Sequence, residues 1–309
     1  MSTNSAAARA TIESPPDAMI ERKPRDDEID VWGVTHRGNV RQTNEDHFLL
    51  GSLHKRLDIR STSLPADEQL RACDERLGFL AMVADGVGGH VAGEEASRMV
   101  LEDITQYVTH STATYYQADA QSETFVELLQ DAAMRSHARL LERAQADADL
   151  RGMATTLTLY MGIWPWVYLL QVGDSRYYTY REGVLTQVTR DQTVAQELVD
   201  QGIMTDSVAF NSRWAHVLSS AIGGRQTVPV VKRFRNAWEM VHLMCSDGLT
   251  KHVPDDRIAD RLANMTSARD ACERLLQDAL DGGGTDNVTI IVGRAHDPRP
   301  AIEAGALER

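Results

Sequence analysis

The sequence predicts an α+β fold in which antiparallel β-sheets are covered by helices. Strand-like apolar runs are numerous, and few of them alternate with helices in the way that parallel sheets require. The two longest helical patterns instead stand together in the middle of the chain, over residues 93–108 and 123–148. With 309 residues and 42% hydrophobic content, the chain can form a substantial buried core.

Individual elements follow from local patterns. Strands are expected at residues 31–35, 48–50, 78–84, 154–163, 166–172, 177–180, 228–234, 240–244 and 288–292. In the second long helix the apolar residues recur at helical spacing, as in Phe125, Leu128 and Leu129. Shorter helices are expected at residues 194–201, 255–263 and 268–280. Because helices seldom separate the strands, we expect mainly antiparallel sheets with the helices packed outside them.

The two ends of the chain differ in composition from its middle. Residues 1–27 are rich in Ala, Ser, Thr and Pro and finish in a run of charges, which is typical of a disordered leader. Residues 297–309 are expected to form a loose tail. The sequence therefore predicts one globular domain over residues 28–296.

Charge and cysteine content restrict the classes of partner. The chain has 32 basic and 45 acidic residues, a formal net charge of −13, which argues against nucleic acid and anionic membranes. The longest apolar run, residues 157–172, is interrupted by Pro165 and is too short to cross a bilayer. The cysteines at 73, 245 and 272 lack metal-ligand spacing, so we expect reduced thiols. These features predict a cytoplasmic protein.

Asp85 is the first acidic residue that suggests chemistry. It follows the apolar run 77–84 and is succeeded by three glycines within four residues. A cation could then bind both the carboxylate and a main-chain carbonyl of glycine, because glycine has no Cβ to obstruct its approach. Taken alone, the Asp-Gly pair is more often an ordinary turn.

The same context recurs along the chain, which favours a metal site over a turn. The acids near strand ends are Glu45, Asp46, Asp85, Asp174, Asp247 and Asp286, most of them close to glycine. Strand ends that converge would offer only oxygen ligands, as Mg²⁺ and Mn²⁺ prefer. Two such ions about 4 Å apart can lower the pKa of a shared water and hold it in line with a phosphorus atom.

Arg41 adds a group that the acids lack. Its planar guanidinium, four residues before Glu45, could bind a phosphoryl group with two parallel hydrogen bonds and stabilise transition-state charge. The alternative is a surface arginine paired with Glu45, which would contribute little. The neighbouring motifs favour the phosphate-binding role.

Six motifs in order resemble those of the metal-dependent serine/threonine protein phosphatases of type 2C, in their bacterial form. The motifs are Arg41 with Asn44-Glu45-Asp46, Asp85-Gly86-Val87-Gly88-Gly89, Gly152-Met153-Ala154-Thr155-Thr156, Gly173-Asp174-Ser175-Arg176, Cys245-Ser246-Asp247-Gly248-Leu249 and Asp286-Asn287-Val288-Thr289. The resemblance extends over roughly residues 30–294. It implies a four-layer αββα sandwich, two antiparallel sheets flanked by helices, with a two-metal centre at one edge.

The resemblance also implies a role for each site residue. The implied metal ligands are Glu45, Asp85, the Gly86 carbonyl, Asp174, Asp247 and Asp286. Asp85 would bridge two Mn²⁺ or Mg²⁺ ions, and Asp174 stands where bacterial relatives hold a weaker third ion. Asp46 would orient metal-bound water, and Arg41 matches the phosphate-binding arginine.

The implied reaction is attack by a metal-bridging hydroxide on phosphoserine or phosphothreonine, without a phosphoenzyme. Phosphorylated proteins are then the expected substrates, and the reaction would reverse a bacterial serine/threonine kinase. No cysteine nucleophile is needed, and Cys245 is expected to be a buried, inert thiol. A silent phosphopeptide-binding scaffold is the first alternative, but it would be expected to have lost a metal acid. A two-metal nuclease or small-phosphoester hydrolase is the second, and it would require basic groove residues, which the net charge of −13 does not suggest.

Four departures from the family pattern leave questions open. Residues 191–193 read Asp-Gln-Thr where many relatives have Asp-His-Ser, and the flap at 202–220 has no proline and carries Trp214 and His216. His216 is therefore an alternative metal ligand. Val87 replaces a histidine of eukaryotic relatives, so the proton donor to the leaving group is left open between metal-bound water and His90. The segment 52–76 is expected to be a solvated loop, with a partner-binding loop as the alternative.

Overall fold

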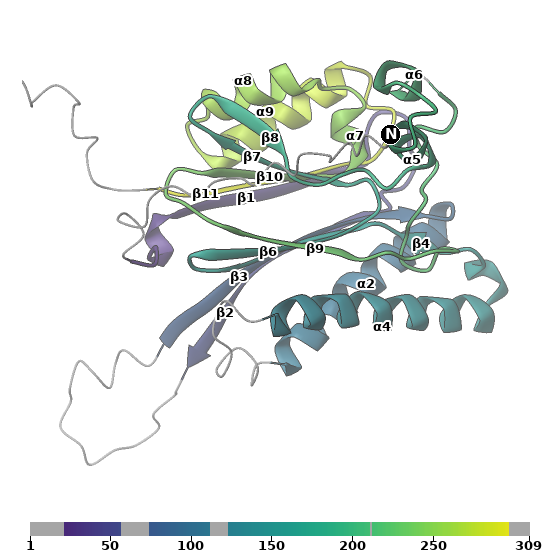
Figure 1. The fold of residues 1–309 in the computed structure, drawn as a ribbon, viewed down its shortest axis with the longest axis horizontal. Coiled ribbons are helices and arrows are strands. Elements are labelled where there is room, and N and C mark those ends of the chain that lie inside the picture. Colours follow the sequence, from purple (N-terminus) through teal and green to yellow (C-terminus); the bar gives the residue numbers. More distant parts are fainter. Residues whose placement is uncertain (1–21, 57–73, 112–122, 211, 297–309) are drawn as a thin grey trace, which may run out of the picture.

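The computed structural model describes residues 22–56, 74–111, 123–210 and 212–296. Two β-sheets pack face to face, and helices cover the outer face of each sheet (Figure 1). Every strand pairing within these ranges is antiparallel. The architecture confirms the predicted sandwich of two antiparallel sheets between helical layers.

The first sheet has the strand order β1-β11-β10-β7-β8. Its strands are β1 (Ile29–His36), β7 (Arg176–Arg181), β8 (Val184–Gln187), β10 (Val241–Cys245) and β11 (Val288–Ala295). The helices α7 (Asp247–Thr250), α8 (Asp255–Ala263) and α9 (Ala268–Asp281) cover its outer face. Leu243, Leu275 and Ile290 belong to the buried apolar layer between this sheet and its helices. Burial of that layer holds the helices in place.

The second sheet has the strand order β2-β3-β5-β6-β9, with β4 paired to β3. Its strands are β2 (Asp46–Arg56), β3 (Asp74–Val87), β4 (Ala154–Thr155), β5 (Leu157–Ile163), β6 (Trp166–Val172) and β9 (Val230–Arg235). The long helices α2 (His90–His110) and α4 (Thr124–Ala146) cover its outer face. Phe125 and Leu129 of α4, which the helical spacing pointed to, are buried there. None of the helices within the described ranges combines the length and apolarity needed to cross a bilayer.

Some elements differ from the prediction for local reasons. The expected strand at 154–163 is divided into β4 and β5, because the intervening Thr156 donates its N–H to the Asp85 carbonyl (2.9 Å). Strand β8 and the short helices α6 (Asp206–Phe210) and α7 were not predicted. The β2–β3 hairpin extends into the segment expected to be a loop, and residues 57–73 of that segment lie outside the described residues.

Part of the expected leader contacts the domain. Glu28, at the end of a short 3₁₀ turn (Asp26–Glu28), is buried and accepts hydrogen bonds from Arg22 at 2.6 and 2.7 Å. The Arg22 guanidinium also lies 5.0 Å from the centre of the Trp238 ring. Residues 22–27 are thus held by ion pairs, and residues 1–21 and 297–309 lie outside the described part of the chain.

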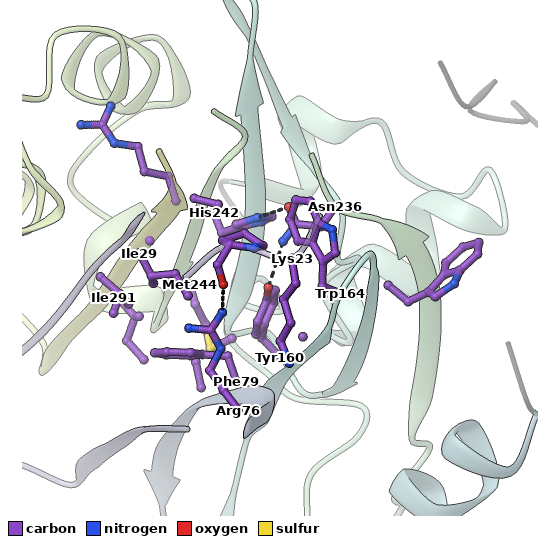
Figure 2. A pocket seen from close by; sticks show the side chains of 18 of the residues that line it. Lys23, Ile29, Arg76, Phe79, Tyr160, Trp164, Asn236, His242, Met244 and Ile291 are labelled. Carbon is purple, nitrogen blue, oxygen red and sulfur yellow. Dashed lines mark hydrogen bonds between the residues drawn. The ribbon is translucent and has the colours of Figure 1, made fainter. Parts of the chain in front are cut away.

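The sheets enclose a small cavity at the end where β1 begins and β11 ends. Its volume is about 90 Å³, and aromatic side chains such as Phe79, Tyr160 and Trp164 contribute to its wall (Figure 2). His242 lies in this wall, where it accepts a hydrogen bond from the Tyr177 hydroxyl (2.6 Å) and donates one to Asn236 Oδ1 (2.9 Å). Burial lowers the pKa of His242 to about 4.

The buried His242 should make the fold sensitive to acid. The unfolded chain takes up the proton near pH 6.5 and the folded chain only near 4, so His242 lowers the free energy of unfolding as the pH falls through that window. The expected loss is about 2 kcal/mol between about pH 7 and about pH 5. Urea unfolding of wild type and His242→Gln over this range measures it. The variant should lose less stability than wild type, with His110→Gln on the exposed part of α2 as control. Equal losses in wild type and His242→Gln would contradict the prediction.

Candidate active site

The predicted acids meet at the end of the sandwich opposite the cavity. Strand β2 begins at Asp46, which pairs with Asp85 near the end of β3. In the other sheet β10 ends two residues before Asp247, and β11 begins two residues after Asp286. Antiparallel pairing thus brings the start of one strand beside the end of its neighbour, which places all four carboxylates together.

Asp46 is held firmly in this cluster. The residue is 3% exposed, and its Oδ2 accepts hydrogen bonds from Ser246 Oγ (2.7 Å) and Thr289 Oγ1 (2.8 Å). Burial raises the pKa of Asp46 to about 7, although the two hydroxyls oppose the shift, and the charges of Asp247 and Asp286 add to it. Two hydroxyls from the other sheet therefore fix the orientation of this carboxylate.

Asp85 is fixed through its backbone. Its N–H donates to Thr156 Oγ1 (3.0 Å), and its carbonyl accepts from Thr155 Oγ1 (2.8 Å). Burial raises the pKa of Asp85 well above the ordinary value, and the charges of neighbouring acids, Asp46 first among them, raise it further. The carboxylate thus lies where negative charge is already concentrated.

Glycines make room for the ligand positions beside Asp85. A Cβ on Gly86 would collide with the Gly93 carbonyl, and a Cβ on Gly93 would collide with Glu45 Oε2. Gly86 also donates its N–H to the Glu45 carbonyl (3.2 Å). The two glycines therefore let Glu45, the end of β3 and the first turn of α2 approach one another closely.

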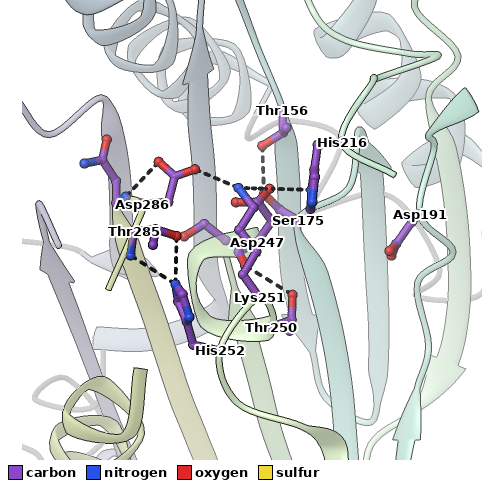
Figure 3. Close-up of polar contacts among 12 residues, drawn as sticks. Thr156, Ser175, Asp191, His216, Asp247, Thr250, Lys251, His252, Thr285 and Asp286 are labelled. Atoms are coloured by element: carbon purple, nitrogen blue, oxygen red, sulfur yellow. Dashed lines mark hydrogen bonds and ion pairs between the residues drawn. The ribbon is translucent and has the colours of Figure 1, made fainter. Parts of the chain in front are cut away.

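Lys251 bridges Asp247 and Asp286, and Arg41 pairs with Asp286 alone. Lys251 Nζ lies 2.6 Å from Asp247 Oδ2 and 2.7 Å from Asp286 Oδ2. Arg41 contacts both oxygens of Asp286, with Nε at 2.8 Å and Nη2 at 3.0 Å. Burial would raise the pKa of Asp286, but Lys251 and Arg41 outweigh it and lower that pKa. Figure 3 shows the lysine between the two carboxylates.

Asp174 lies in the turn between β6 and β7 and is buried. Burial raises its pKa well above the ordinary value, and the charges of Asp247 and Asp191 contribute. Gln192, which replaces the histidine of many relatives, has a structural role: its Oε1 accepts from the Gly173 N–H (2.7 Å). Asp191 is held by Arg176, with Nη2 at 2.7 Å from Oδ2.

The carboxylate oxygens of this cluster are the kind of ligand that divalent cations such as Mg²⁺ and Mn²⁺ prefer. Within the part of the chain that the structure describes, Asp46 Oδ1 and Asp247 Oδ1 are buried side-chain oxygens without a hydrogen-bond partner. Unpaired buried oxygens are costly unless a cation or donor satisfies them. In the same ranges, no three His, Cys, Asp or Glu side chains are already arranged as a cage for a metal ion. The carboxylates therefore suit an ion, but Lys251 and Arg41 engage two of them.

A cleft opens over the acid cluster. Its volume is about 700 Å³, and its wall includes Arg41, Asp174, Asp247 and Asp286. Residues of α5 (Val194–Asp200) and of the flap at 202–220 form the opposite wall. The flap residue His216 is exposed, and its Nδ1 lies 3.9 Å from Asp247 Oδ2. The structure therefore brings His216 beside the cluster, and its role as a ligand stays a prediction.

Comparison with known proteins identifies the family. The model of the protein phosphatase 2C family matches residues 59–282, which is more than half of the chain. The chain belongs to the protein phosphatase 2C family. This finding confirms the resemblance drawn from the six motifs.

Relatives in this family are named serine/threonine phosphatases. The chain is 33% identical over 218 residues to the serine/threonine protein phosphatase PstP of Mycobacterium tuberculosis, an alignment that covers 71% of this chain and 40% of PstP. The serine/threonine phosphatase stp of Listeria monocytogenes is 28% identical over 261 residues, covering 84% of this chain and 92% of stp. The chain thus matches less than half of the length of PstP.

Solved structures of the family share the fold. A crystal structure of Mycobacterium tuberculosis PstP has a TM-score of 0.70 at 28% identity, covering 87% of this chain and 99% of that one. A structure of the PstP catalytic domain in complex with two manganese ions has a TM-score of 0.68 at 29% identity, with the same coverage of both chains. The metal in that relative agrees with the donor chemistry seen here.

Several site residues of this family member were not predicted. Lys251, Asn287, Ser246 and Thr289 all contact the predicted acids or their loop. Lys251 had a local signal, because it follows Asp247 by four residues on a helical turn. Cys245, by contrast, was predicted correctly: it is buried, and burial raises the pKa of its thiol to about 12.

Proposed function

We propose that this protein is a metal-dependent phosphatase that hydrolyses phosphoserine and phosphothreonine in proteins. The observation that carries the proposal is the convergence of Asp46, Asp85, Asp247 and Asp286 at one end of the sandwich, beside Arg41. Oxygen donors from both sheets are brought together there, and the Arg41 guanidinium, which could bind a phosphoryl group, lies at the rim of the same cleft. Family membership supports the same activity.

The cluster would hold Mn²⁺ or Mg²⁺, in a two-ion centre with Asp174 as the residue for a third ion. The residues that would hold the ions are Glu45, Asp85, the Gly86 carbonyl, Asp174, Asp247 and Asp286. Such ions lower the pKa of water and neutralise charge on the phosphoryl oxygens. Burial, and after it the repulsion from neighbouring acids, raises the pKa of Asp85 and Asp174. This supports the assignment, because bound cations would relieve the repulsion.

Asp46 and Arg41 would act on water and substrate respectively. The Asp46 carboxylate, fixed by Ser246 and Thr289, has its Oδ1 free to accept a hydrogen bond from the attacking water. Arg41 is half-exposed at the mouth of the cleft, from which it would pair with two phosphoryl oxygens. The substrates would be products of a serine/threonine kinase, whose action this phosphatase would reverse.

Arg41→Ala tests the phosphate-binding role. Loss of two charge-assisted hydrogen bonds should lower kcat/KM for a phosphothreonine peptide by about 10- to 100-fold, with the larger part in KM. Steady-state phosphate release with Mn²⁺ measures it. Arg135→Ala, which changes an exposed arginine paired with Asp131 on α4, is the matched control and should leave both parameters unchanged. Wild-type KM in Arg41→Ala would rule out the assignment.

A further inference from the structure

Lys251 occupies a central position among the acids. It follows α7 directly, and its N–H donates to the Asp247 carbonyl (2.9 Å), which continues the helical turn. The turn directs the side chain back over Asp247, so that Nζ bridges carboxylates of two separate segments (Figure 3). The side chain is 21% exposed, so water screens these ion pairs only partly.

The chain's own cations engage most of the oxygens concerned. Asp286 Oδ1 accepts from Arg41 Nε and from the Asn287 N–H (2.9 Å), and Asp286 Oδ2 contacts both Arg41 and Lys251. In Asp247 only Oδ2 is engaged by Lys251, while Oδ1 is buried without a partner. An ion bound by these two carboxylates must therefore compete for oxygens that an ammonium group already contacts.

We propose that Lys251 is a built-in counter-ion that competes with the metal ion for Asp247 and Asp286 and so sets the affinity of that ion. The inference rests on the proposed metal centre. In the metal-free protein Lys251 offsets the repulsion between the two acids, and metal binding requires the ammonium to leave them. The competition would keep this ion exchangeable, so that the occupancy of the centre follows the metal concentration.

Two effects of removing Lys251 act in the same direction. Without the ammonium, the acids repel each other in the metal-free state, so this state loses stability. The incoming ion also no longer meets a neighbouring positive charge, so the metal-bound state gains stability. Both changes tighten metal binding. A lysine that merely anchored α7 would affect stability without tightening metal binding.

Lys251→Met separates these roles by direct binding measurements. We expect the Kd of Mn²⁺ from titration calorimetry of the full chain to fall about 10-fold for one class of site, and Tm in EDTA to fall. Lys251→Arg keeps a cation and should bind Mn²⁺ with nearly wild-type affinity. The control is Lys232→Met on β9, whose Nζ contacts the Val188 carbonyl away from the acids. Lys251→Gln is titrated instead if the Met variant does not fold in EDTA.

The outcomes distinguish the inference from the proposed function. Unchanged or weaker Mn²⁺ binding by folded Lys251→Met or Lys251→Gln, with normal binding by wild type, would overturn the role of Lys251 alone. No Mn²⁺ binding by wild type would overturn the metal centre, and this inference with it. Tighter binding in both Lys251→Met and Lys232→Met would show a general charge effect and would also overturn the inference.

Discussion

Asp85→Asn should lower the hydrolysis of a phosphothreonine peptide by at least about 100-fold, because it removes the charge at the centre of the proposed metal site. An amide offers one neutral oxygen where the carboxylate offers two charged ones. Asp85 also lies opposite Asp46 in the β2–β3 ladder. Phosphate release at saturating Mn²⁺ measures the effect.

The stability of Asp85→Asn shows whether lost activity reflects lost structure. Because burial and neighbouring acids disfavour the ionised Asp85, the variant should be at least as stable as wild type in EDTA. Asp281→Asn at the exposed end of α9 is the control and should keep full activity. A folded Asp85→Asn protein with activity within about twofold of wild type would contradict the proposed role.

Asn287→Ala should reduce the free energy of unfolding by about 2–4 kcal/mol, because it leaves several buried polar groups without partners. The Asn287 side chain accepts from the Glu45 N–H (2.8 Å) and donates to the carbonyls of Arg37 (3.0 Å) and Thr43 (2.9 Å). It thereby ties the loop that carries Arg41 to the start of β11. Urea unfolding measures the loss of stability.

The same variant should also lose activity, because the loop positions both Arg41 and Glu45. Asn264→Ala is the matched control, since the side chain of that exposed asparagine bonds to Asp260, one helical turn earlier, and the change should alter stability by less than about 0.5 kcal/mol. Wild-type stability in Asn287→Ala would show that the loop is held by other contacts.

The sheet and helix layers of the sandwich and the acid cluster were predictable because they depend on local sequence patterns. Asp85 and Asp247 stand at the ends of apolar runs beside glycine, and antiparallel pairing then brings such strand ends together. The strand at 166–172 matches β6, since its run is apolar except for Gln171 and is bounded by Pro165 and Gly173. The order of the six motifs, through the family resemblance, then predicted that the sheets form a two-sheet sandwich.

The features that were missed depend on contacts distant in sequence or on weak local patterns. Asn287 bonds to the Glu45 N–H across 242 residues, and no sequence period marks such a contact. Strand β8 has only four half-buried or exposed residues, so its pattern was too short to distinguish from a turn. The ion pair between Lys251 and Asp286 likewise could not be predicted, because it forms between two segments that only the folded sheet brings together.

The most direct test of the central claim is phosphate release from a phosphothreonine peptide in EDTA and after addition of Mn²⁺ or Mg²⁺, with wild type and Asp247→Asn in parallel. We expect no release by wild type in EDTA, restored release with metal, and little release by the variant under any condition. Full activity in EDTA would contradict the metal-dependent mechanism. Peptide binding without phosphate release at every metal concentration would instead identify a phosphopeptide-binding scaffold.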